Sequence, residues 1–239
     1  MNWTRILGKL DAARYILQSK IYPSYSQAGE DQLIRYLFQS LGIEDPTYLD
    51  IGANHPYICS NTFLFYSRGS KGVCIEPDED CFTLLKKCRR RDILLQAAIS
   101  STPGTAELYV FPDPYTGWNT LSKTEAESRQ QQTGIQIRKV TPIPVLHIND
   151  VMSKYFNPHP NLLSLDVEGL DLEILESIDF DKHCPEVICV ETITFSMNQE
   201  EQKISEIASF LLSKNYFIFG DTHVNTIFCH RDFYKKQVK

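Results

Sequence analysis

Acidic side chains stand at the ends of three apolar segments of the sequence. Asp50 lies near the end of the first segment, Glu76 follows the second, and Asp166 follows the third. If these segments are parallel strands of one sheet, their carboxyl ends meet at the edge where open α/β sheets bind ligands. Carboxylates at that edge can accept hydrogen bonds from ligand hydroxyls or remove a proton from one. The spacing therefore predicts a ligand site built from strand ends.

The turn after Asp50 contains a single glycine, in the run Gly52-Ala53-Asn54. Gly52 has no Cβ, so it lets the backbone approach a ligand closely. A turn that cradles a pyrophosphate would contain G-x-G-x-x-G, so this turn favours a cofactor without a pyrophosphate. Glu76 follows Asp50 by 26 residues and is placed to accept both hydroxyls of an adenosine ribose. The alternative for each carboxylate is a helix cap or a solvated turn.

A second pair of carboxylates follows the third segment, in Asp166-Val167-Glu168-Gly169. Both would lie on the ligand-binding edge of the sheet, where they can orient a substrate or move a proton. The alternative is that Asp166 caps the next helix.

The elements that must position these residues alternate between short apolar strands and helices. The expected strands are 47–51, 72–75, 93–99, 162–166 and 187–191, followed by a late pair at 216–219 and 226–230. The expected helices are 30–40, 61–67, 79–90, 148–155, 171–177 and 199–214. This alternation predicts an α/β fold with a mostly parallel sheet buried on both faces, and the late pair predicts an antiparallel hairpin.

Two regions depart from this alternation. Residues 1–44 are predicted to form a helical N-terminal cap, and residues 45–239 the main domain. An insertion at about 105–145 is predicted to be strand, polar loop, strand, and such long insertions are often functional. Its Tyr115 and Trp118 either stack on a sugar face, as part of a lid, or pack within the loop.

Composition and charge exclude several classes of protein. With 42% hydrophobic residues, the chain can bury a sizeable core. Its 24 basic and 30 acidic residues disfavour attraction of the whole surface to nucleic acid. The basic run at 86–91 is expected to be a solvated helix end rather than a phosphate contact. Seven cysteines without a C-x-x-C pair favour buried free thiols, and we expect a soluble, cytoplasmic protein.

Taken together, three motifs resemble the FkbM-type family of S-adenosylmethionine-dependent methyltransferases. They are Asp50-Ile51-Gly52-Ala53-Asn54, Ile75-Glu76-Pro77 and Asp166-Val167-Glu168-Gly169-Leu170-Asp171, with supporting stretches at 25–31, 55–62 and 91–98. The resemblance covers about residues 24–192. It implies a seven-stranded, mostly parallel, Rossmann-like methyltransferase sheet with a C-terminal antiparallel hairpin, and methyl transfer to a hydroxyl oxygen. Substrates in the family are often sugars, glycolipid or polysaccharide units, and polyketide-type natural products.

The resemblance also implies S-adenosyl-L-methionine as the cofactor. Its methionine end would lie on residues 50–54, its ribose on Glu76 and its adenine near Ala97 and Ala98. The implied cofactor-binding residues are Gln27, Glu30, Asp50, Gly52, Ala53, Asn54, Asn61, Glu76, Pro77, Ala97, Ala98 and Asp166.

Methyl transfer to an alcohol requires that the acceptor oxygen be aligned with the methyl group and lose its proton. We expect His55 or Asp166 to be the base, with Glu168 binding or orienting the acceptor hydroxyl. No resident metal is predicted, because Asp166 and Glu168, even with Glu191, are a sparse ligand set for Mg²⁺. The run Asp113-Pro114-Tyr115 is similar to the D-P-P-Y motif of amino-methylating enzymes. It lies in the insertion, however, so methylation of a base is disfavoured.

The sequence therefore predicts an O-methyltransferase that acts on a sugar or glycoconjugate hydroxyl. An O-methyltransferase for a polyketide- or peptide-type small molecule is the alternative, because only the acceptor pocket would differ. A non-catalytic cofactor-binding or scaffold protein is a third reading, against which Asp166 and Glu168 argue. An amphipathic helix within residues 1–19 would pack on the domain, pair two subunits into a homodimer, or dock on a membrane. No nucleic-acid partner is expected.

Overall fold

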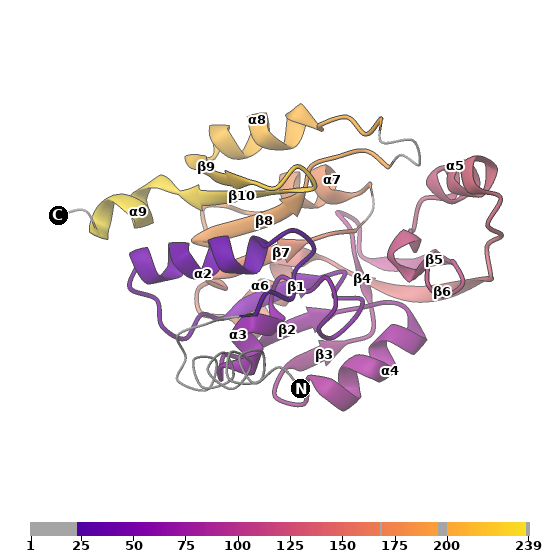
Figure 1. The fold of residues 1–239 in the computed structure, drawn as a ribbon, viewed down its shortest axis with the longest axis horizontal. Helices are drawn as coiled ribbons and strands as arrows, with labels where there is room; N and C mark the ends of the chain where they lie inside the picture. Colours follow the sequence, from indigo (N-terminus) through magenta and orange to yellow (C-terminus); the bar gives the residue numbers. More distant parts are fainter. Residues whose placement is uncertain (1–22, 168, 196–199, 238–239) are drawn as a thin grey trace, which may run out of the picture.

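The computed structural model describes residues 23–167, 169–195 and 200–237. The predicted helix within residues 1–19 and the predicted acceptor-binding Glu168 lie outside these residues. A seven-stranded sheet runs through the centre with helices on both faces, and a smaller three-stranded sheet lies beside it (Figure 1).

The large sheet has the strand order β3-β2-β1-β7-β8-β10-β9. Neighbours from β3 to β8 are parallel, and β10 is antiparallel to both β8 and β9. The α/β fold with a C-terminal antiparallel hairpin is therefore confirmed. The strands are β1 (Tyr48–Ile51), β2 (Gly72–Ile75), β3 (Ile93–Leu95), β7 (Leu162–Leu165), β8 (Val187–Glu191), β9 (Tyr216–Asp221) and β10 (Asn225–His230).

Each face of this sheet carries its own hydrophobic cluster, because successive side chains of a strand point to opposite faces. In β1, Leu49 and Ile51 pack into one cluster and Tyr48 into the other. The first cluster is covered by α6 (Ile148–Tyr155), α7 (Asp171–Glu176) and α8 (Ser205–Ser213). The second is covered by α2 (Glu30–Ser40), α3 (Phe63–Ser67), α4 (Glu79–Cys88) and α9 (Arg231–Gln237).

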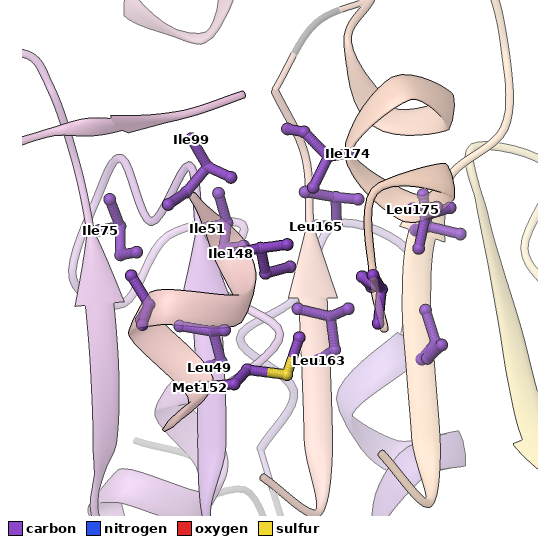
Figure 2. Packing of buried hydrophobic residues seen from close by; sticks show 14 of the residues in the cluster. Leu49, Ile51, Ile75, Ile99, Ile148, Met152, Leu163, Leu165, Ile174 and Leu175 are labelled. Atoms are coloured by element: carbon purple, nitrogen blue, oxygen red, sulfur yellow. The ribbon is translucent and has the colours of Figure 1, made fainter. Parts of the chain in front are cut away.

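Figure 2 shows how the first cluster holds the central strands together. Met152 of α6 lies between Leu49 of β1 and Leu163 of β7, and Ile174 of α7 lies above Leu165. Burial of each side chain of this size contributes about 1.5–3 kcal/mol to the stability of the fold. The rigid centre of the sheet therefore fixes the strand ends from which the site is built.

The small sheet consists of β4 (Ala98–Ile99), β5 (Gly104–Val110) and β6 (Lys139–Leu146), in the order β4-β6-β5. The prediction of a single strand at 93–99 is wrong, because the two halves of this segment belong to different sheets. Ile93–Leu95 pairs with β2, whereas Ala98–Ile99 pairs with β6 of the insertion. The polar segment between β5 and β6 also contains a short 3-10 turn, η1 (Thr116–Trp118), and α5 (Lys123–Thr133) rather than a loop alone. Ser122 caps α5 by accepting from the Glu125 amide, and Gly134, with φ +74°, ends it.

The helix expected at 199–214 begins only at Ser205. The backbone before it is used in strand-like pairing: Lys203 forms an isolated bridge with Ile193, and the Ile204 amide donates to the Thr192 carbonyl. Helix α9, close to the C-terminus, was not expected from the sequence.

Candidate functional site

A cavity of about 770 Å³ lies at the carboxyl ends of β1, β2, β7 and β8, and the β5–β6 insertion forms another part of its wall. Its volume is within the range of small-molecule sites, about 300–1,000 Å³. Glu30 does not line it. The predicted site residues that do line it are Gln27, Asp50, Gly52, Ala53, Asn54, His55, Asn61, Glu76, Pro77, Ala97, Ala98 and Asp166.

Gly52 is required by the packing of the turn itself. Its φ is +79°, and a Cβ at this position would lie 1.9 Å from the carbonyl oxygen of Asp166. The amides of Gly52 and Ala53 both donate to the Ile75 carbonyl, at 3.0 and 3.1 Å. The glycine thus allows the turn after β1 to lie against the end of β7, which is a different reason from the ligand approach expected from the sequence.

Glu76 connects the end of β2 to that turn. Its Oε2 accepts from the Asn54 amide and its Oε1 from the Asp78 amide, both at 2.7 Å. Burial raises the pKa of Glu76 to about 7, although these two hydrogen bonds favour the charged form. A carboxylate oxygen can accept more than one hydrogen bond, so Glu76 retains capacity for ligand hydroxyls.

Asp50 is buried beneath the turn and belongs to a polar network. Its Oδ2 accepts from Thr62 Oγ1 at 2.5 Å. Thr62 Oγ1 in turn accepts from Arg89 Nη2 at 2.9 Å. Arg89 Nε donates to Asp92 Oδ2 at 2.8 Å. Burial raises the pKa of Asp50, while Arg89 and the Thr62 hydroxyl act in the opposite direction.

Arg89 corrects the expectation of a solvated basic run. Its side chain is only 1% exposed, whereas Lys86, Lys87 and Arg90 are exposed as expected. Arg89 follows the fully buried Leu85 by four residues, a spacing that places both on one face of the helix. That spacing is the sequence signal that would have identified it.

His55 lines the cavity, but its ring is held by backbone groups. Nδ1 accepts from the amides of Tyr57 and Ile58, at 3.3 and 3.0 Å. Burial lowers the pKa of His55, so the neutral ring is favoured. Because Nδ1 accepts, the neutral ring carries its proton on Nε2. This arrangement suits a hydrogen-bond donor better than a base.

Asp166 is exposed to the cavity, and its amide donates to the Ile51 carbonyl at 3.1 Å. It does not cap α7, which begins after Leu170 without a side-chain cap. Asp171, which the sequence did not single out as a site residue, accepts from the amides of Val167 and Gly169 at 3.3 Å. Burial raises the pKa of Asp171 to about 6. Its carboxyl group thus fixes the backbone that carries Asp166.

The insertion contacts the turn after β1 directly. Thr116 Oγ1 donates to Asn54 Oδ1 at 3.3 Å. Trp118 stacks on Tyr115, with ring centroids 4.5 Å apart, and meets Phe195 edge-on at 5.3 Å. Trp118 therefore both packs within the insertion and lines the cavity, while Tyr115 lies behind it.

Two lining residues that were not predicted from the sequence each carry a buried polar atom without a hydrogen-bond partner among the described residues. They are Asn119 Nδ2 and Glu201 Oε2. Asn119 Oδ1, by contrast, accepts from the Phe111 amide at 2.8 Å. Both atoms are buried by protein atoms, so they lie beneath the surface of the cavity rather than on it.

The charges that line the cavity are mostly negative. Among the described lining residues, the basic side chain other than His55 is Arg138, and its Nη2 lies 2.9 Å from Asp80 Oδ2. The acidic lining residues are Asp50, Glu76, Asp80, Asp113, Asp166, Glu191 and Glu201. Within the described parts of the chain, no group of three or more His, Cys, Asp or Glu side chains could hold a metal ion. No helix in those parts is long and apolar enough to cross a membrane.

Comparison with known proteins finds a methyltransferase family model and a relative named as a methyltransferase. The family model for the methyltransferase FkbM domain matches residues 50–218. The hexuronic acid methyltransferase AglP of Haloferax volcanii is 28% identical over 179 residues, which are 70% of this chain and 64% of that protein. This chain thus matches less than two thirds of the length of that relative.

Solved structures to which this chain is similar include the methyltransferase FkbM of Methylobacillus flagellatus KT. The alignment covers 78% of this chain and 44% of that protein, with 15% sequence identity and a TM-score of 0.48. A putative caffeoyl-CoA O-methyltransferase of Staphylococcus aureus aligns with 91% of this chain and 90% of its own, at 11% identity and a TM-score of 0.45.

Proposed function

This chain belongs to the FkbM methyltransferase family, and on that premise we propose that it uses S-adenosyl-L-methionine to methylate a hydroxyl oxygen of a sugar or glycoconjugate. The observation that carries the proposal is the cavity, which brings the carboxylates at the ends of β1, β2 and β7 together. The curated relative named as a hexuronic acid methyltransferase supports a sugar as the acceptor.

The residues at the β1 and β2 ends fit the proposed cofactor. Glu76, buried and held by two amides, would accept the ribose hydroxyls. The turn at residues 50–54 would hold the methionine end, and Ala97 and Ala98 would lie against the adenine. When bound, the cofactor supplies an electrophilic methyl group on a sulfonium.

Asp166 is the better base of the two that the sequence suggested. Its side chain is exposed in the cavity, and the loop that carries it is fixed by Asp171. In this assignment the Asp166 carboxylate takes the proton of the acceptor hydroxyl as the oxygen attacks. His55, whose Nδ1 accepts two amides, donates through Nε2 and orients the acceptor.

The test has a cofactor step and an acceptor step. S-adenosylhomocysteine at 100 times its Kd should add about 2.7 kcal/mol of stability, a rise in Tm of roughly 5–10 °C for a chain of this size. Methyl transfer is then measured by product mass with methyl glycosides, uronates and phenolic aglycones as separate acceptors. Asp166→Asn should lower kcat by about 10²–10⁴-fold while the affinity for S-adenosylhomocysteine stays within twofold.

Two results would contradict the proposal. Absence of any thermal shift with S-adenosylhomocysteine at millimolar concentration would remove the cofactor. Methylation of the phenolic aglycones alone would retain the enzyme and replace the acceptor class.

A further inference from the structure

The backbone on both sides of the β8–α8 connection forms a paired structure at the edge of the cavity. We call residues 192–195 and 200–204 the wall segment. Ile193 and Lys203 form a bridge, the Thr194 amide donates to the Gln202 carbonyl at 2.9 Å, and the Ile204 amide donates to the Thr192 carbonyl at 2.8 Å. The Thr192 amide also donates to the Val224 carbonyl at 2.9 Å, which attaches the first strand of the segment to the turn between β9 and β10.

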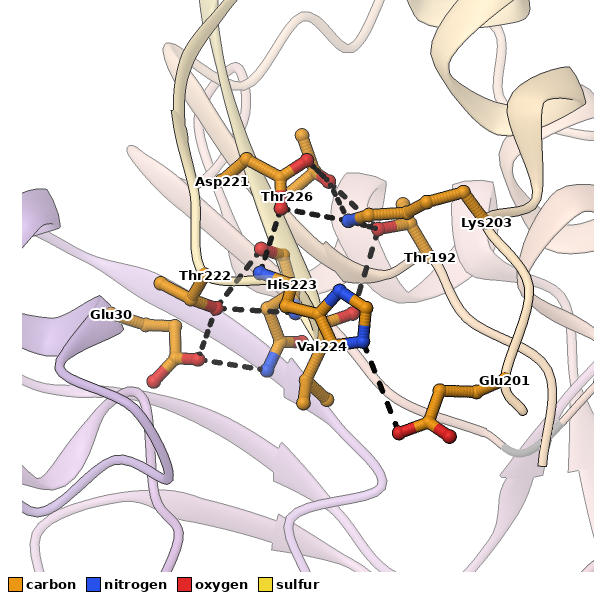
Figure 3. Close-up of polar contacts among 10 residues, drawn as sticks. Glu30, Thr192, Glu201, Lys203, Asp221, Thr222, His223, Val224 and Thr226 are labelled. Carbon is orange, nitrogen blue, oxygen red and sulfur yellow. Dashed lines mark hydrogen bonds and ion pairs between the residues drawn. The ribbon is translucent and has the colours of Figure 1, made fainter. Parts of the chain in front are cut away.

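Lys203 attaches the second strand of the segment to the same hairpin. Its Nζ donates to Asp221 Oδ1 at 2.8 Å, to Thr192 Oγ1 at 2.9 Å and to Thr226 Oγ1 at 3.3 Å (Figure 3). An ammonium has three N–H donors, so these contacts use its full capacity. Asp221 and Thr226 belong to the β9–β10 hairpin, so one side chain joins the wall segment to the sheet. Thr192 and Thr226 also share a hydrogen bond of 2.7 Å beside the ammonium.

The hairpin to which Lys203 binds is itself fixed. Thr222 Oγ1 and Asn225 Nδ2 donate to Glu30 Oε1 at the start of α2, at 2.6 and 3.2 Å. Burial raises the pKa of Asp221, but the hydrogen bonds from Lys203 and the His223 amide outweigh this effect and lower it. Asp221 is therefore a charged partner for Lys203 at neutral pH.

The other side of the wall segment faces the cavity. Ile193, Thr194 and Phe195 all line it. Phe195 meets Trp118 of the insertion at 5.3 Å, and the Arg129 guanidinium lies 4.9 Å from the Phe195 ring. The wall segment is thus held between the hairpin and the insertion, on the half of the cavity that lies beyond β7.

We propose that Lys203 is a positioning residue that holds Ile193, Thr194 and Phe195 in place as the acceptor-binding wall. This inference rests on the proposed function, because it assigns the β8 half of the cavity to the acceptor. Among the described residues, the hydrogen bonds of the Lys203 ammonium go to Asp221, Thr192 and Thr226, and not to the turn after β1 or to Glu76, which form the proposed cofactor half. Removing its charge should therefore change acceptor binding and leave cofactor binding intact.

The kinetic test uses Lys203→Met, which keeps most of the aliphatic stem and removes the three hydrogen bonds. We expect the KM for the methyl glycoside that the wild type methylates best to rise about tenfold or more. We expect kcat to change less than threefold and the Kd of S-adenosylhomocysteine less than twofold. Lys203→Arg should recover at least half of the change in log KM, because a guanidinium can still pair with Asp221. The matched control is Lys182→Met, which breaks the exposed pair of Lys182 with Asp179.

A second measurement needs no acceptor. The chain has two tryptophans, so Trp3→Phe leaves Trp118 as the sole emitter. Because Phe195 packs against Trp118, a displaced wall segment should expose the indole, and the acrylamide quenching constant should rise about twofold in Lys203→Met. Asp221→Asn, which keeps the side-chain volume, should raise it in the same direction.

The two readouts separate failure of this inference from failure of the proposed function. If the wild type methylates no acceptor but quenching rises in both variants, the positioning role stands and the proposed function falls. Unchanged quenching in both variants overturns the inference. The inference is also overturned if the acceptor KM of Lys203→Met stays within twofold of the wild-type value. It is overturned as well if Lys203→Met loses as much affinity for S-adenosylhomocysteine as for the acceptor.

Discussion

Arg89 balances the charge of a buried carboxylate beneath the turn after β1. The Asp92 side chain is fully buried, and its Oδ2 lies 2.8 Å from Arg89 Nε. Arg89→Met would leave that carboxylate without a cation, which typically costs about 3–5 kcal/mol. We expect a loss of this size in the free energy of unfolding measured with urea.

The control for that prediction is Arg90→Met, one residue along and exposed, which should change stability by less than about 0.5 kcal/mol. Arg89→Met combined with Asp92→Asn should recover part of the loss, because the double variant removes the Asp92 charge together with its cation. Equal losses in the Arg89 and Arg90 variants would contradict the role given to this pair.

Glu76 makes cofactor binding depend on pH. Burial raises its pKa to about 7, so the free protein protonates Glu76 below neutral pH, whereas both of its oxygens accept strongly from ribose hydroxyls only in the charged carboxylate. We expect the Kd of S-adenosylhomocysteine, measured by calorimetry, to rise by up to about tenfold for each pH unit below 7. Above that pH it should level off.

The raised pKa of Glu76 also makes the stability of the free protein depend on pH. Cofactor binding weakens as the pH falls, whereas this contribution to stability weakens as the pH rises. A carboxyl group with a raised pKa in the folded state binds more protons than in the unfolded chain between pH 4.5 and about 7. Its contribution to stability is present below that window and is lost as the pH rises through it. In Glu76→Gln the pH dependence of Kd should disappear, and that of stability should weaken, because Asp171, whose pKa is raised to about 6, still titrates in the same window. A persistent pH effect on Kd would assign it to another group.

Strand-end reasoning located Glu76 and Asp166 from the sequence because both follow directly from the direction of parallel strands. Arg89, Asp171 and Glu201 were missed for a common reason. Each acts through atoms brought together by the folded chain: a buried partner for Arg89, loop amides for Asp171, and a cavity wall for Glu201. For Arg89, the four-residue spacing from the buried Leu85 was an overlooked signal, whereas the direction of the loop amides and the course of the cavity wall are not encoded in local residue spacing.

At the scale of elements, apolar periodicity predicted the central strands and α2 and α6 almost to the residue. It failed where an element buries few apolar side chains. Helix α5 buries Ala126 and Arg129 alone, so its sequence shows no apolar stripe. The division of 93–99 into two strands depends on pairing with β6, more than forty residues further along, which local pattern does not encode.

Glu30 illustrates how two elements are joined. The sequence resemblance placed it in the cofactor site, whereas the structure has it fully buried and bonded to Thr222, Asn225 and the Ala28 amide. Glu30→Gln should therefore lower the free energy of unfolding by about 1.5–3 kcal/mol at pH 7, the range for hydrogen bonds to a charged group. The Kd of S-adenosylhomocysteine should stay within twofold of the wild type.

The pH dependence of this loss provides the check. Burial raises the pKa of Glu30, but hydrogen bonds led by that of Thr222 outweigh it, so the net pKa is lowered. A lowered pKa contributes stability above about pH 4.5 that is lost as the pH falls. The difference between Glu30→Gln and wild type should shrink accordingly below that pH. Loss of cofactor affinity with unchanged stability would place Glu30 in the site instead.

At the scale of the whole molecule, the site lies where three parts of the chain meet. The β1–β2 side of the sheet supplies the proposed cofactor half, the wall segment supplies the other half, and the insertion connects them through Thr116 and Trp118. Arg138 and Lys139 of the insertion also pair with acidic residues of α4. Methyl donor and acceptor would thus be held by parts of the chain that are braced against each other.

The summed charge of this assembly predicts which sugars it accepts. The chain has a net charge of -6, and the described cavity lining carries seven carboxylates against Arg138, which is already paired. A uronate would bring another negative charge close to Asp113, Asp166 and Glu191, in surroundings where water screens it incompletely. We therefore expect kcat/KM for a neutral methyl glycoside to exceed that for the matching uronate by about tenfold or more, equivalent to about 1.4 kcal/mol.

The dependence of this acceptor preference on ionic strength distinguishes charge repulsion from a difference in the size of the acceptor. Raising the ionic strength from about 0.05 M to 0.5 M shortens the screening length and should reduce the preference several-fold if charge causes it. The methyl ester of the same uronate, which has the larger group but no charge, should react at a rate close to that of the neutral glycoside. A uronate preferred at both salt concentrations would contradict the prediction and align the acceptor with that of the hexuronic acid methyltransferase.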